Sequence, residues 1–249
     1  MFGVIGGTGL DKMKGLIVNK YETIKTPYGE TSEPLVFGSI ADHLDIAFIA
    51  RHGKNHSIPP HLINYQANIW ALHSVGVTNL IAVNTVGSIN TKFLPGDFVF
   101  PDQIIDYTYS RKNTFADGIK NPVKHIDFTK PLDSDLVNQF IKVSSILKLK
   151  YHLNGVYACV QGPRLESAAE INRYDNDGAN IVGMTAMPEA SLAREIGLNY
   201  ALICPVANHA AGRGLNKDGV SHEQINANSE KMVLNIANLI KGIFESYGN

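Results

Sequence analysis

Apolar residues in this chain fall into short, nearly continuous runs, and from residue 44 onward these runs alternate with stretches of helical spacing. A strand that is covered on both faces carries apolar side chains at successive positions, so such runs are typical of buried strands. The runs predict strands at residues 2–7, 22–25, 34–40, 44–50, 80–83, 98–107, 155–160, 181–182 and 200–206.

Helical spacing of apolar residues predicts helices between these strands. We expect them at residues 64–75, 136–149, from 167 onward, at 189–195 and at 222–247. Gly76 is a stop signal for the first, and Ser167 followed by Glu170 is a capping-box pattern. Strands that alternate with helices indicate an α/β fold, a three-layer sandwich around a mixed, largely parallel sheet. No Gly/Ser run, Pro-rich tract or charge block interrupts the chain, so we expect a single domain over residues 1–249.

Composition and charge exclude several classes of function. The chain has 22 Lys and Arg against 23 Asp and Glu, a formal net charge of -1, and no basic stripe, which argues against a nucleic-acid partner. No apolar run approaches the roughly 20 residues of a membrane helix, and the N-terminal MFGVIGGTGL lacks the basic region of a signal peptide. Cys159 and Cys204 have no CxxC spacing, so we interpret them as reduced core residues of a cytoplasmic protein.

Small and polar residues follow the predicted strands at their carboxyl ends, where ligands bind in sheets of this kind. These ends carry Gly-Thr at 7–8, Arg-His at 51–52, Thr-Val-Gly-Ser at 85–88, Pro-Arg-Leu-Glu at 163–166, Gly-Met-Thr at 183–185 and Ala-Asn-His at 207–209. Hydroxyls and an arginine suit a phosphate, and a methionine suits the face of a ribose. A glutamate with an asparagine suits the hydrogen-bonding edge of a heterocycle.

Two other ligand classes fit the sequence less well. The turn at residues 6–9, Gly-Gly-Thr-Gly, is neither the dinucleotide GxGxxG nor a Walker loop, which disfavours a dinucleotide or ATP site. His52, His56 and His61 cluster after one strand, but their spacing matches no zinc pattern and no Cys or paired carboxylate is nearby. We therefore expect no metal site.

With these strand ends in view, the chain resembles the trimeric purine nucleoside phosphorylase family, and most of all its branch of methylthioadenosine and methylthioinosine phosphorylases. The matching stretches occur in the family's order over essentially the whole chain: GVIGGTGL, TPYGETS, ARHGKNH, INYQANIWAL, NTVGS, PGDFVFPDQIIDYT, QGPRLESAAEI, VGMTAMPEASLARE and VANHAAG. The resemblance implies a sheet curled into a distorted barrel. It also implies a pentosyltransferase that breaks an N-glycosidic bond with inorganic phosphate as co-substrate, without metal or organic cofactor, as a homotrimer with sites at its subunit interfaces.

The resemblance also implies roles for individual residues. It places the phosphate among Thr8, Arg51, His52, Thr85 and Thr185. Met184 then lies under the ribose, His125 reaches into the site of the neighbouring subunit, and Glu166 and Asn208 face the purine. Each of these residues also has an ordinary structural interpretation, Met184 as part of the core and His52 or His125 as a loop histidine.

The residue types at positions 166 and 208 bear on which base is bound. An ionised Glu166 accepts the N1–H that only a 6-oxopurine possesses, and the Asn208 amide donates to N7 or O6. Adenine presents a lone pair at N1, and a site built to accept a proton rejects an analogue that lacks it. Methylthioadenosine phosphorylases have a small hydroxyl residue in place of Glu166 and aspartates in place of Asn208 and Ala210. We therefore expect a 6-oxopurine nucleoside phosphorylase in which Asn208 and Glu166 are the catalytic residues.

The sequence gives two candidates for the 5′ substituent of the nucleoside, a methylthio group and a hydroxyl group. The stretches GVIGGTGL and ARHGKNH favour a 5′-methylthio group, and hence S-methyl-5′-thioinosine as the substrate of a purine salvage reaction. His222 corresponds to a histidine with which 5′-hydroxyl phosphorylases of the family bind inosine and guanosine, whereas a methylthio pocket favours an apolar side chain. We expect methylthioinosine first, inosine and guanosine second, and methylthioadenosine less. A purine-binding module without activity is the alternative from another class, and loss of a phosphate ligand would indicate it.

Overall fold

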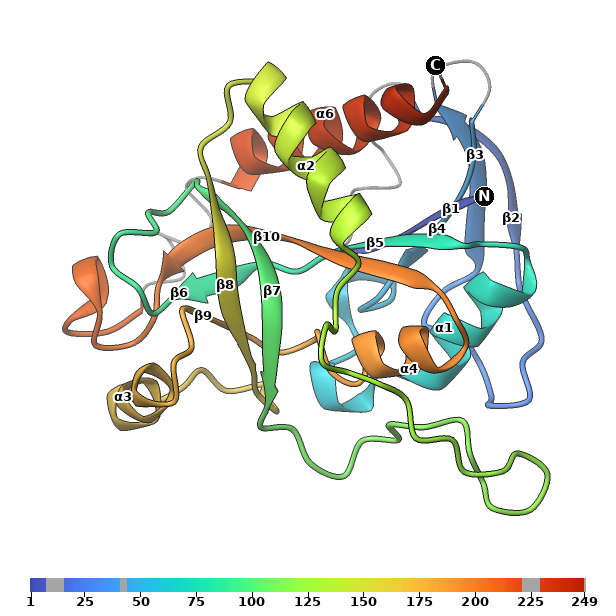
Figure 1. The fold of residues 1–249 in the computed structure, drawn as a ribbon, viewed down its shortest axis with the longest axis horizontal. Helices are drawn as coiled ribbons and strands as arrows, with labels where there is room; N and C mark the ends of the chain where they lie inside the picture. The colour runs from blue at the N-terminus through green and yellow to red at the C-terminus, as the bar shows by residue number, and fades with distance from the viewer. Residues whose placement is uncertain (8–15, 41–43, 221–228, 249) are drawn as a thin grey trace.

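The computed structural model describes residues 1–7, 16–40, 44–220 and 229–248 (Figure 1). The strands within these ranges are β1 (Phe2–Gly6), β2 (Ile17–Glu22), β3 (Leu35–Ile40), β4 (Leu44–Ala50), β5 (Asn79–Val83), β6 (Val86–Ser88), β7 (Phe98–Asp106), β8 (Tyr151–Cys159), β9 (Ile181–Gly183) and β10 (Asn199–His209). The α-helices are α1 (Tyr65–Ser74), α2 (Ser134–Ile146), α3 (Ala168–Asn176), α4 (Glu189–Glu195) and α6 (Ser229–Gly248).

A single sheet holds the described strands, in the order β2-β3-β4-β1-β5-β10-β6-β9-β8-β7. β10 also pairs with β7, so β10, β6, β9, β8 and β7 close into a five-stranded barrel at one end of the sheet. Among the described residues, six of the ten strand pairings are parallel. The predicted mixed, largely parallel, barrel-like sheet is therefore confirmed.

β10 joins the open part of the sheet to the barrel. It is 11 residues long and pairs with β5 near its start and with β6 near its end. Its register against β6 shifts between Val206 and Asn208. A bulge of this kind bends a strand and re-aims the side chains that follow it, and Asn208 is the residue directly after the shift.

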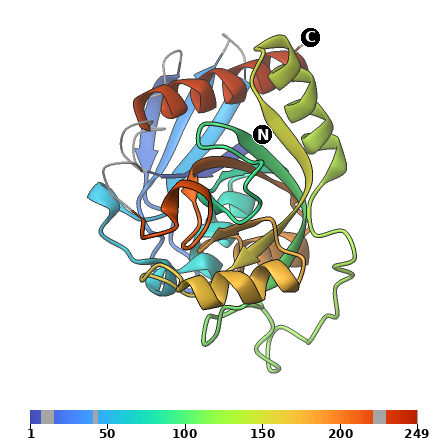
Figure 2. The same ribbon diagram turned by 90° about the vertical axis from the view of Figure 1, so that its left-hand side faces the viewer.

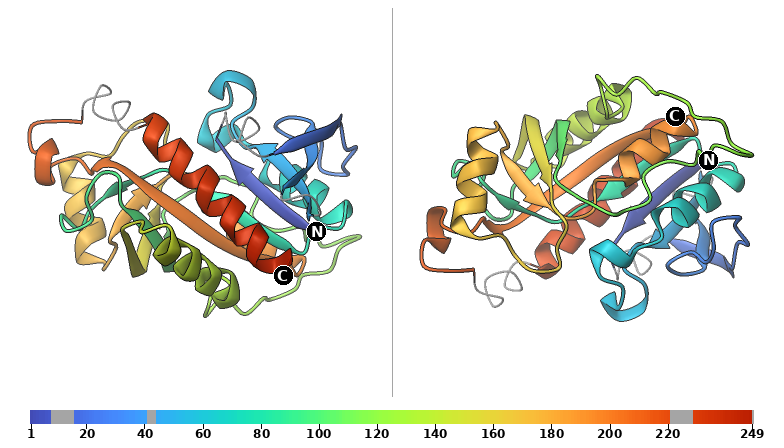
Figure 3. Two further views of the ribbon diagram at one scale, coloured as in Figure 1. Left: turned by 90° about the horizontal axis from the view of Figure 1, so that it is seen from above. Right: turned by 90° about the horizontal axis from the view of Figure 1, so that it is seen from below.

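Helices cover the sheet on two sides, which gives the three layers seen in Figure 1. On one side α2 and α6 pack against each other and against β10, and from above α6 runs alongside β10 (Figure 3). On the other side lie α1 and α4, which pack against each other. Figure 2 shows α6 across the top of the molecule and α3 across the bottom, with the barrel between them. Two large clusters of buried apolar side chains fill the space between the sheet and these helix pairs.

The helices begin and end where their capping residues predict. Asn64 precedes α1, and its side chain accepts a hydrogen bond from the Ala67 backbone N–H. Gly76 follows that helix with a φ of 92°, a conformation that glycine adopts without strain. Ser167 and Glu170 form the predicted capping box at α3. Within the described ranges, no helix combines the length and the apolar composition needed to cross a bilayer.

Several strand boundaries differ from the sequence predictions. β2 lies at Ile17–Glu22 rather than at 22–25, because it is an exposed edge strand whose polar residues hide the pattern. β6 has only three residues, too few for any periodicity. β8 starts four residues before the predicted 155, in a partly exposed polar stretch. The predicted start of the last helix at residue 222 lies outside the described residues, and α6 is described from Ser229.

Candidate active site

A cavity of about 280 Å³ lies where the strands of the sheet end. Among the residues that line it are seven from the sequence analysis: Arg51, His52, Thr85, Glu166, Met184, Thr185 and Asn208. They come from five separate segments of the chain. Arg51, Thr85 and Asn208 lie at the ends of β4, β5 and β10, which run in one direction, whereas β8 and β9, which precede the other segments, run in the opposite direction. The fold therefore places the residues predicted to bind phosphate, ribose and purine around one space.

The other three predicted site residues lie elsewhere. Thr8 and His222 are outside the described residues. His125 is exposed on the long connection between β7 and α2, residues 107–133, and is not part of the cavity wall. The resemblance assigns His125 to the site of a neighbouring subunit, and this role stays a prediction.

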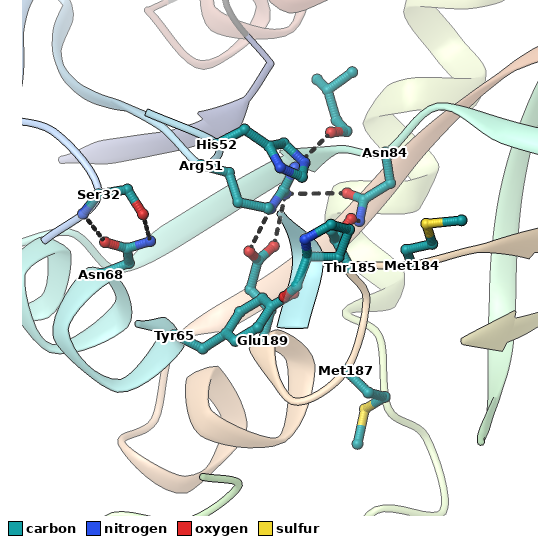
Figure 4. Close-up of polar contacts among 12 residues, drawn as sticks. Ser32, Arg51, His52, Tyr65, Asn68, Asn84, Met184, Thr185, Met187 and Glu189 are labelled. Atoms are coloured by element: carbon teal, nitrogen blue, oxygen red, sulfur yellow. Dashed lines mark hydrogen bonds and ion pairs between the residues drawn. The ribbon is translucent and has the colours of Figure 1, made fainter. Parts of the chain in front are cut away.

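Arg51 is buried at the end of β4 and is held by a carboxylate that the sequence analysis did not single out. Its Nε and Nη2 donate to the two carboxylate oxygens of Glu189 at 2.7 and 2.8 Å (Figure 4). Nη1 donates to the backbone oxygen of Val83 at 3.0 Å, and Nη2 also donates to Oδ1 of Asn84 at 3.2 Å. These bonds use four of the five N–H groups of the guanidinium. One N–H of Nη1 is therefore left for a ligand. Arg51 cannot make the bidentate contact with phosphate that an arginine commonly makes.

Burial and charge act in opposite directions on this pair. Arg51 and Glu189 are each 1% exposed. Burial alone would lower the pKa of Arg51, but the Glu189 carboxylate outweighs it and raises that pKa above the usual value. Tyr200 donates to the same carboxylate at 2.8 Å, which satisfies it further. The two charges offset each other. An anion in this part of the cavity would therefore be bound by oriented N–H and O–H donors more than by net positive charge.

Thr185 is the second residue after β9, with only 6% of its surface exposed. Its Oγ1 accepts a hydrogen bond of 2.7 Å from Nδ2 of Asn84 (Figure 4). Thr85, by contrast, is an exposed residue on the cavity wall. Both hydroxyls belong to the wall that also carries Arg51, so the groups predicted to bind phosphate lie together.

His52 is neutral at physiological pH and has a defined tautomer. Nδ1 lies 2.9 Å from the carbonyl oxygen of Ile58, and because a carbonyl only accepts, Nδ1 carries the proton. Burial, and then the charge of Arg51, lower the pKa of His52 to about 4. Nε2 is thus left as a hydrogen-bond acceptor. The ring stacks on His56 with centroids 4.0 Å apart, and within the part of the chain that the structure describes no group of three His, Cys, Asp or Glu side chains could hold a metal ion.

Two glycines allow the turn at Met184 to pack closely. At Gly183 an added Cβ would overlap the hydroxyl of Tyr157, which is fully buried beneath the turn. At Gly162, whose φ of 62° lies in the left-handed region, an added Cβ would overlap the Met184 side chain. The thioether of Met184 therefore lies against the loop that leads to Glu166, on the wall of the cavity.

Glu166 and Asn208 line the same cavity from different elements. Glu166 precedes α3, and burial raises the pKa of its carboxyl above the ordinary 4.5. Asn208 is half-buried after the β10 bulge, and its Nδ2 donates to the neighbouring His209 carbonyl at 2.6 Å. The second N–H of that amide and its oxygen are the groups available to a ligand. A carboxylate and an amide that face one cavity suit a ring edge with a donor and an acceptor.

Comparison with known proteins places this site in a family. The family model described as Phosphorylase superfamily matches residues 1–245. The chain belongs to this superfamily. It is 46% identical over 243 residues to the 6-oxopurine nucleoside phosphorylase of Pyrococcus furiosus, covering 95% of this chain and 89% of that protein. It is also 46% identical over 211 residues to a probable S-methyl-5′-thioinosine phosphorylase of Xanthomonas campestris pv. campestris, covering 85% of this chain and 84% of that protein.

Solved structures of the superfamily have the same fold. A methylthioadenosine phosphorylase from an antarctic soil metagenomic library matches with a TM-score of 0.92 and 34% identity, covering 99% of this chain and 86% of that one. Methylthioadenosine phosphorylase from Schistosoma mansoni in complex with adenine matches with a TM-score of 0.92 and 30% identity, covering 99% of this chain and 91% of that one. The family and fold expected from the sequence are confirmed.

Arg111 is a further residue at this phosphorylase site that the sequence did not indicate. It lies on the 107–133 connection, behind the cavity wall. Its guanidinium donates to the carbonyl oxygens of Met184 at 2.8 Å and Met187 at 2.6 Å, on one side of the site. It also donates to the carbonyl oxygen of Gln161 at 2.8 Å, on the loop that leads to Glu166. Arg111 therefore ties the long connection to two segments of the site, and nothing in its polar surroundings in the sequence signals this.

Substitution of Glu189 by glutamine should destabilise the protein strongly. The amide would keep the shape of the carboxylate but would turn an N–H₂ group toward Arg51 and leave a buried charge without compensation. We expect the free energy of unfolding to fall by about 3–5 kcal/mol, as for removal of one partner of a buried ion pair. Urea unfolding measures it.

The matched control is Glu22→Gln, which removes the partner of Lys20 in an ion pair whose side chains are 59% and 45% exposed. Exposed pairs contribute at most about 1 kcal/mol. A loss at Glu189 no larger than that at Glu22 would mean that the Arg51–Glu189 pair does not hold this part of the site together.

Proposed function

We propose that this chain uses phosphate to cleave the N-glycosidic bond of 6-oxopurine nucleosides. The leading reaction converts S-methyl-5′-thioinosine and phosphate to hypoxanthine and 5-methylthioribose 1-phosphate. The observation that carries the proposal is the composition of one cavity wall, on which Glu166 and Asn208 accompany Arg51 and Thr185.

Phosphate is held at the end of the cavity formed by Arg51, Thr85 and Thr185. The two hydroxyls and the remaining Arg51 N–H donate to its oxygens. The neutral His52 accepts from a protonated phosphate oxygen or a ribose hydroxyl through Nε2. Fixing phosphate below the anomeric carbon converts a bimolecular attack into a local one. The phosphate charge then stabilises the oxocarbenium character of the sugar above it.

The purine is held by Glu166 and Asn208. The ionised carboxylate accepts N1–H of hypoxanthine, and the free N–H of the amide donates to N7 or O6. Negative charge collects on the purine as the glycosidic bond breaks, and a donor aimed at that charge stabilises the transition state more than the ground state. Adenine lacks the N1–H, so its lone pair would face the carboxylate and its binding would leave the carboxylate without a donor.

The 5′ group is assigned to methylthio, with 5′-hydroxyl nucleosides as the second candidate. Pro60 and Val220 contribute apolar surface to the cavity wall, which suits a methylthio group better than a hydroxyl. The relatives named for methylthioinosine support the first candidate, and the relative named for 6-oxopurine nucleosides supports the second. Methylthioadenosine, after which the similar solved structures are named, ranks below both because of Glu166 and Asn208.

Purine release tests the proposal. Methylthioinosine, inosine, guanosine and methylthioadenosine are each incubated with the protein, with and without phosphate. The expected result is phosphate-dependent hypoxanthine release that is fastest from methylthioinosine. Faster release from inosine or guanosine assigns the enzyme to the 5′-hydroxyl class, with His222 as a residue of the 5′ site. No phosphate-dependent release from any of them overturns the enzymatic function in favour of a purine-binding module.

The pH dependence of this activity should follow the raised pKa of Glu166. Only the ionised carboxylate accepts N1–H, so kcat/KM for methylthioinosine should fall as the pH drops through a pKa that lies above 4.5. Glu166→Gln is the control. This substitution removes the titrating group. It should lower kcat/KM at neutral pH and abolish the fall of kcat/KM that the titration of Glu166 causes at low pH. An acid limb with the same midpoint in both proteins would show that another group titrates.

We also propose a homotrimer in which His125 completes the site of a neighbouring subunit. His125 is exposed on a connection that also exposes the apolar side chains of Tyr109, Ile119 and Val123, at 67%, 90% and 67%. Apolar side chains exposed to this degree on one connection suit an interface. Light scattering should give three times the 27.2 kDa chain mass, and a monomer at the concentration of the activity assay would overturn this proposal.

A further inference from the structure

Asn84 lies between two of the residues assigned to the phosphate and is bonded to both (Figure 4). It follows β5 and is 2% exposed. Oδ1 accepts from Nη2 of Arg51 at 3.2 Å, and Nδ2 donates to Oγ1 of Thr185 at 2.7 Å. Asn84 therefore connects a fixed cation to a hydroxyl on the cavity wall.

The orientation of the Asn84 amide follows from its neighbours. The guanidinium of Arg51 has donors only, so the amide oxygen must face it. A flipped amide would set N–H₂ against N–H on that side. Arg51 is in turn held by the Glu189 carboxylate at 2.7 and 2.8 Å, so it cannot rotate to relieve such a clash. The amide nitrogen of Asn84 is thereby directed to Thr185.

This orientation decides what the Thr185 hydroxyl does. A threonine hydroxyl has one hydrogen, which rotates to suit its surroundings, and two lone pairs. Because Oγ1 accepts from Asn84, its own hydrogen points away from Asn84. Thr185 lines the cavity, so its hydrogen is available to an acceptor that binds there.

We propose that Asn84 is a positioning residue that directs the Thr185 O–H to a phosphate oxygen. The inference rests on the proposed function, in which Thr185 binds phosphate. Positioning by Asn84 is advantageous because a donor that is oriented before binding needs no reorganisation when the anion binds. The Glu189 carboxylate fixes the guanidinium of Arg51, which fixes the amide of Asn84. The amide in turn orients the hydroxyl of Thr185.

Asn84→Asp tests the direction of this hydrogen bond. Aspartate has the shape of asparagine and still accepts from Arg51, but it presents an acceptor to Thr185. The threonine hydrogen should turn to the aspartate and away from phosphate. We expect the Kd of inorganic phosphate, measured by calorimetry, and the KM for phosphate to rise about 100-fold, from the lost charge-assisted bond and the added negative charge. The KM for the nucleoside should change less than about threefold.

A double-mutant cycle separates the two contributions. In the T185V background there is no hydroxyl to turn, so Asn84→Asp should raise the phosphate Kd only about tenfold, by charge alone. In the T185S background, which keeps the hydroxyl, the full effect should remain. The same factor in the T185V and wild-type backgrounds overturns the proposal, because Asn84 would then act on phosphate without Thr185.

A neutral second variant controls for the charge that Asn84→Asp adds, and folding is checked separately. Asn84→Ala frees the Thr185 hydroxyl without adding charge. It should raise the phosphate Kd about fivefold in the wild-type background and less than about twofold in the T185V background. Circular dichroism and the Tm establish that each variant is folded. Since Kd needs no turnover, absent catalysis in the wild-type protein would overturn the proposed function, whereas equal factors in the cycle overturn only the role of Asn84.

Discussion

Asn208→Ala should lower kcat for phosphate-dependent purine release by about 10²- to 10³-fold, the loss typical of a donor that stabilises transition-state charge. The leaving purine accumulates negative charge, and the Asn208 amide is the donor that the β10 bulge places at the cavity wall. The KM for the nucleoside should change less than kcat, because the bond strengthens only as charge develops. Hypoxanthine release from methylthioinosine measures both parameters.

The control for this prediction is Asn176→Ala, the same chemical change at an exposed position near the end of α3. It should leave kcat unchanged within about twofold, as surface substitutions usually do. Light scattering should show that neither variant alters the oligomeric state. Unchanged turnover in Asn208→Ala would remove Asn208 from the mechanism, and a rise in KM alone would reduce its role to uniform binding of the base.

One part of the site could be predicted because parallel strands bring their carboxyl ends together. β1, β4 and β5 are parallel neighbours, and β5 is also parallel to β10. Residues that follow such strands reach one edge of the sheet whatever their separation in sequence. Arg51, Thr85 and Asn208 lie at or just after the ends of strands that apolar runs identify, so their shared location follows from the pattern. Thr185 follows β9, which runs antiparallel to β6, so this rule does not predict its place beside them.

The partners that orient these residues could not be predicted from the same pattern. Glu189 is paired with Arg51 across 138 positions of sequence, and no local periodicity marks such a contact. Its place in the first turn of α4 has a sufficient local explanation, because acidic residues are favoured there. Arg111 lies in a polar connection in which an arginine is unremarkable. Tertiary hydrogen bonds determine the roles of both, and only the fold reveals them.

The β10 bulge is a second feature of this kind. The apolar run predicts a strand to residue 206, and the structure extends it to His209 with a register shift before Asn208. A bulge has no hydrophobic signature, since it changes the pairing and not the composition of a strand. The sequence thus locates Asn208 at a strand end, whereas the fold determines that the cavity receives it.

Glu166→Ser combined with Asn208→Asp should reverse the preference of the site from hypoxanthine to adenine nucleosides. The serine removes the carboxylate that faces the adenine N1 lone pair, and the aspartate accepts from the adenine amino group. We expect the ratio of kcat/KM for methylthioadenosine to that for methylthioinosine to rise by about 10³-fold or more. Sites that hydrogen-bond a substrate group discriminate by about 10⁴–10⁵ against the analogue that lacks it.

The two single variants are the controls for this change in specificity. Glu166→Ser alone should lose activity toward methylthioinosine without a matching gain for methylthioadenosine, because the neutral amide oxygen of Asn208 accepts from the amino group more weakly than a carboxylate does. Asn208→Asp alone should set two carboxylates around one base and lower activity toward both substrates. Residues that contact one ligand couple, so the gain for adenine in the double variant should exceed the product of the single effects. If hypoxanthine nucleosides remain preferred in the double variant, the hydrogen-bonding edge of the base does not determine specificity here, and the shape of the cavity around Met184 becomes the better explanation.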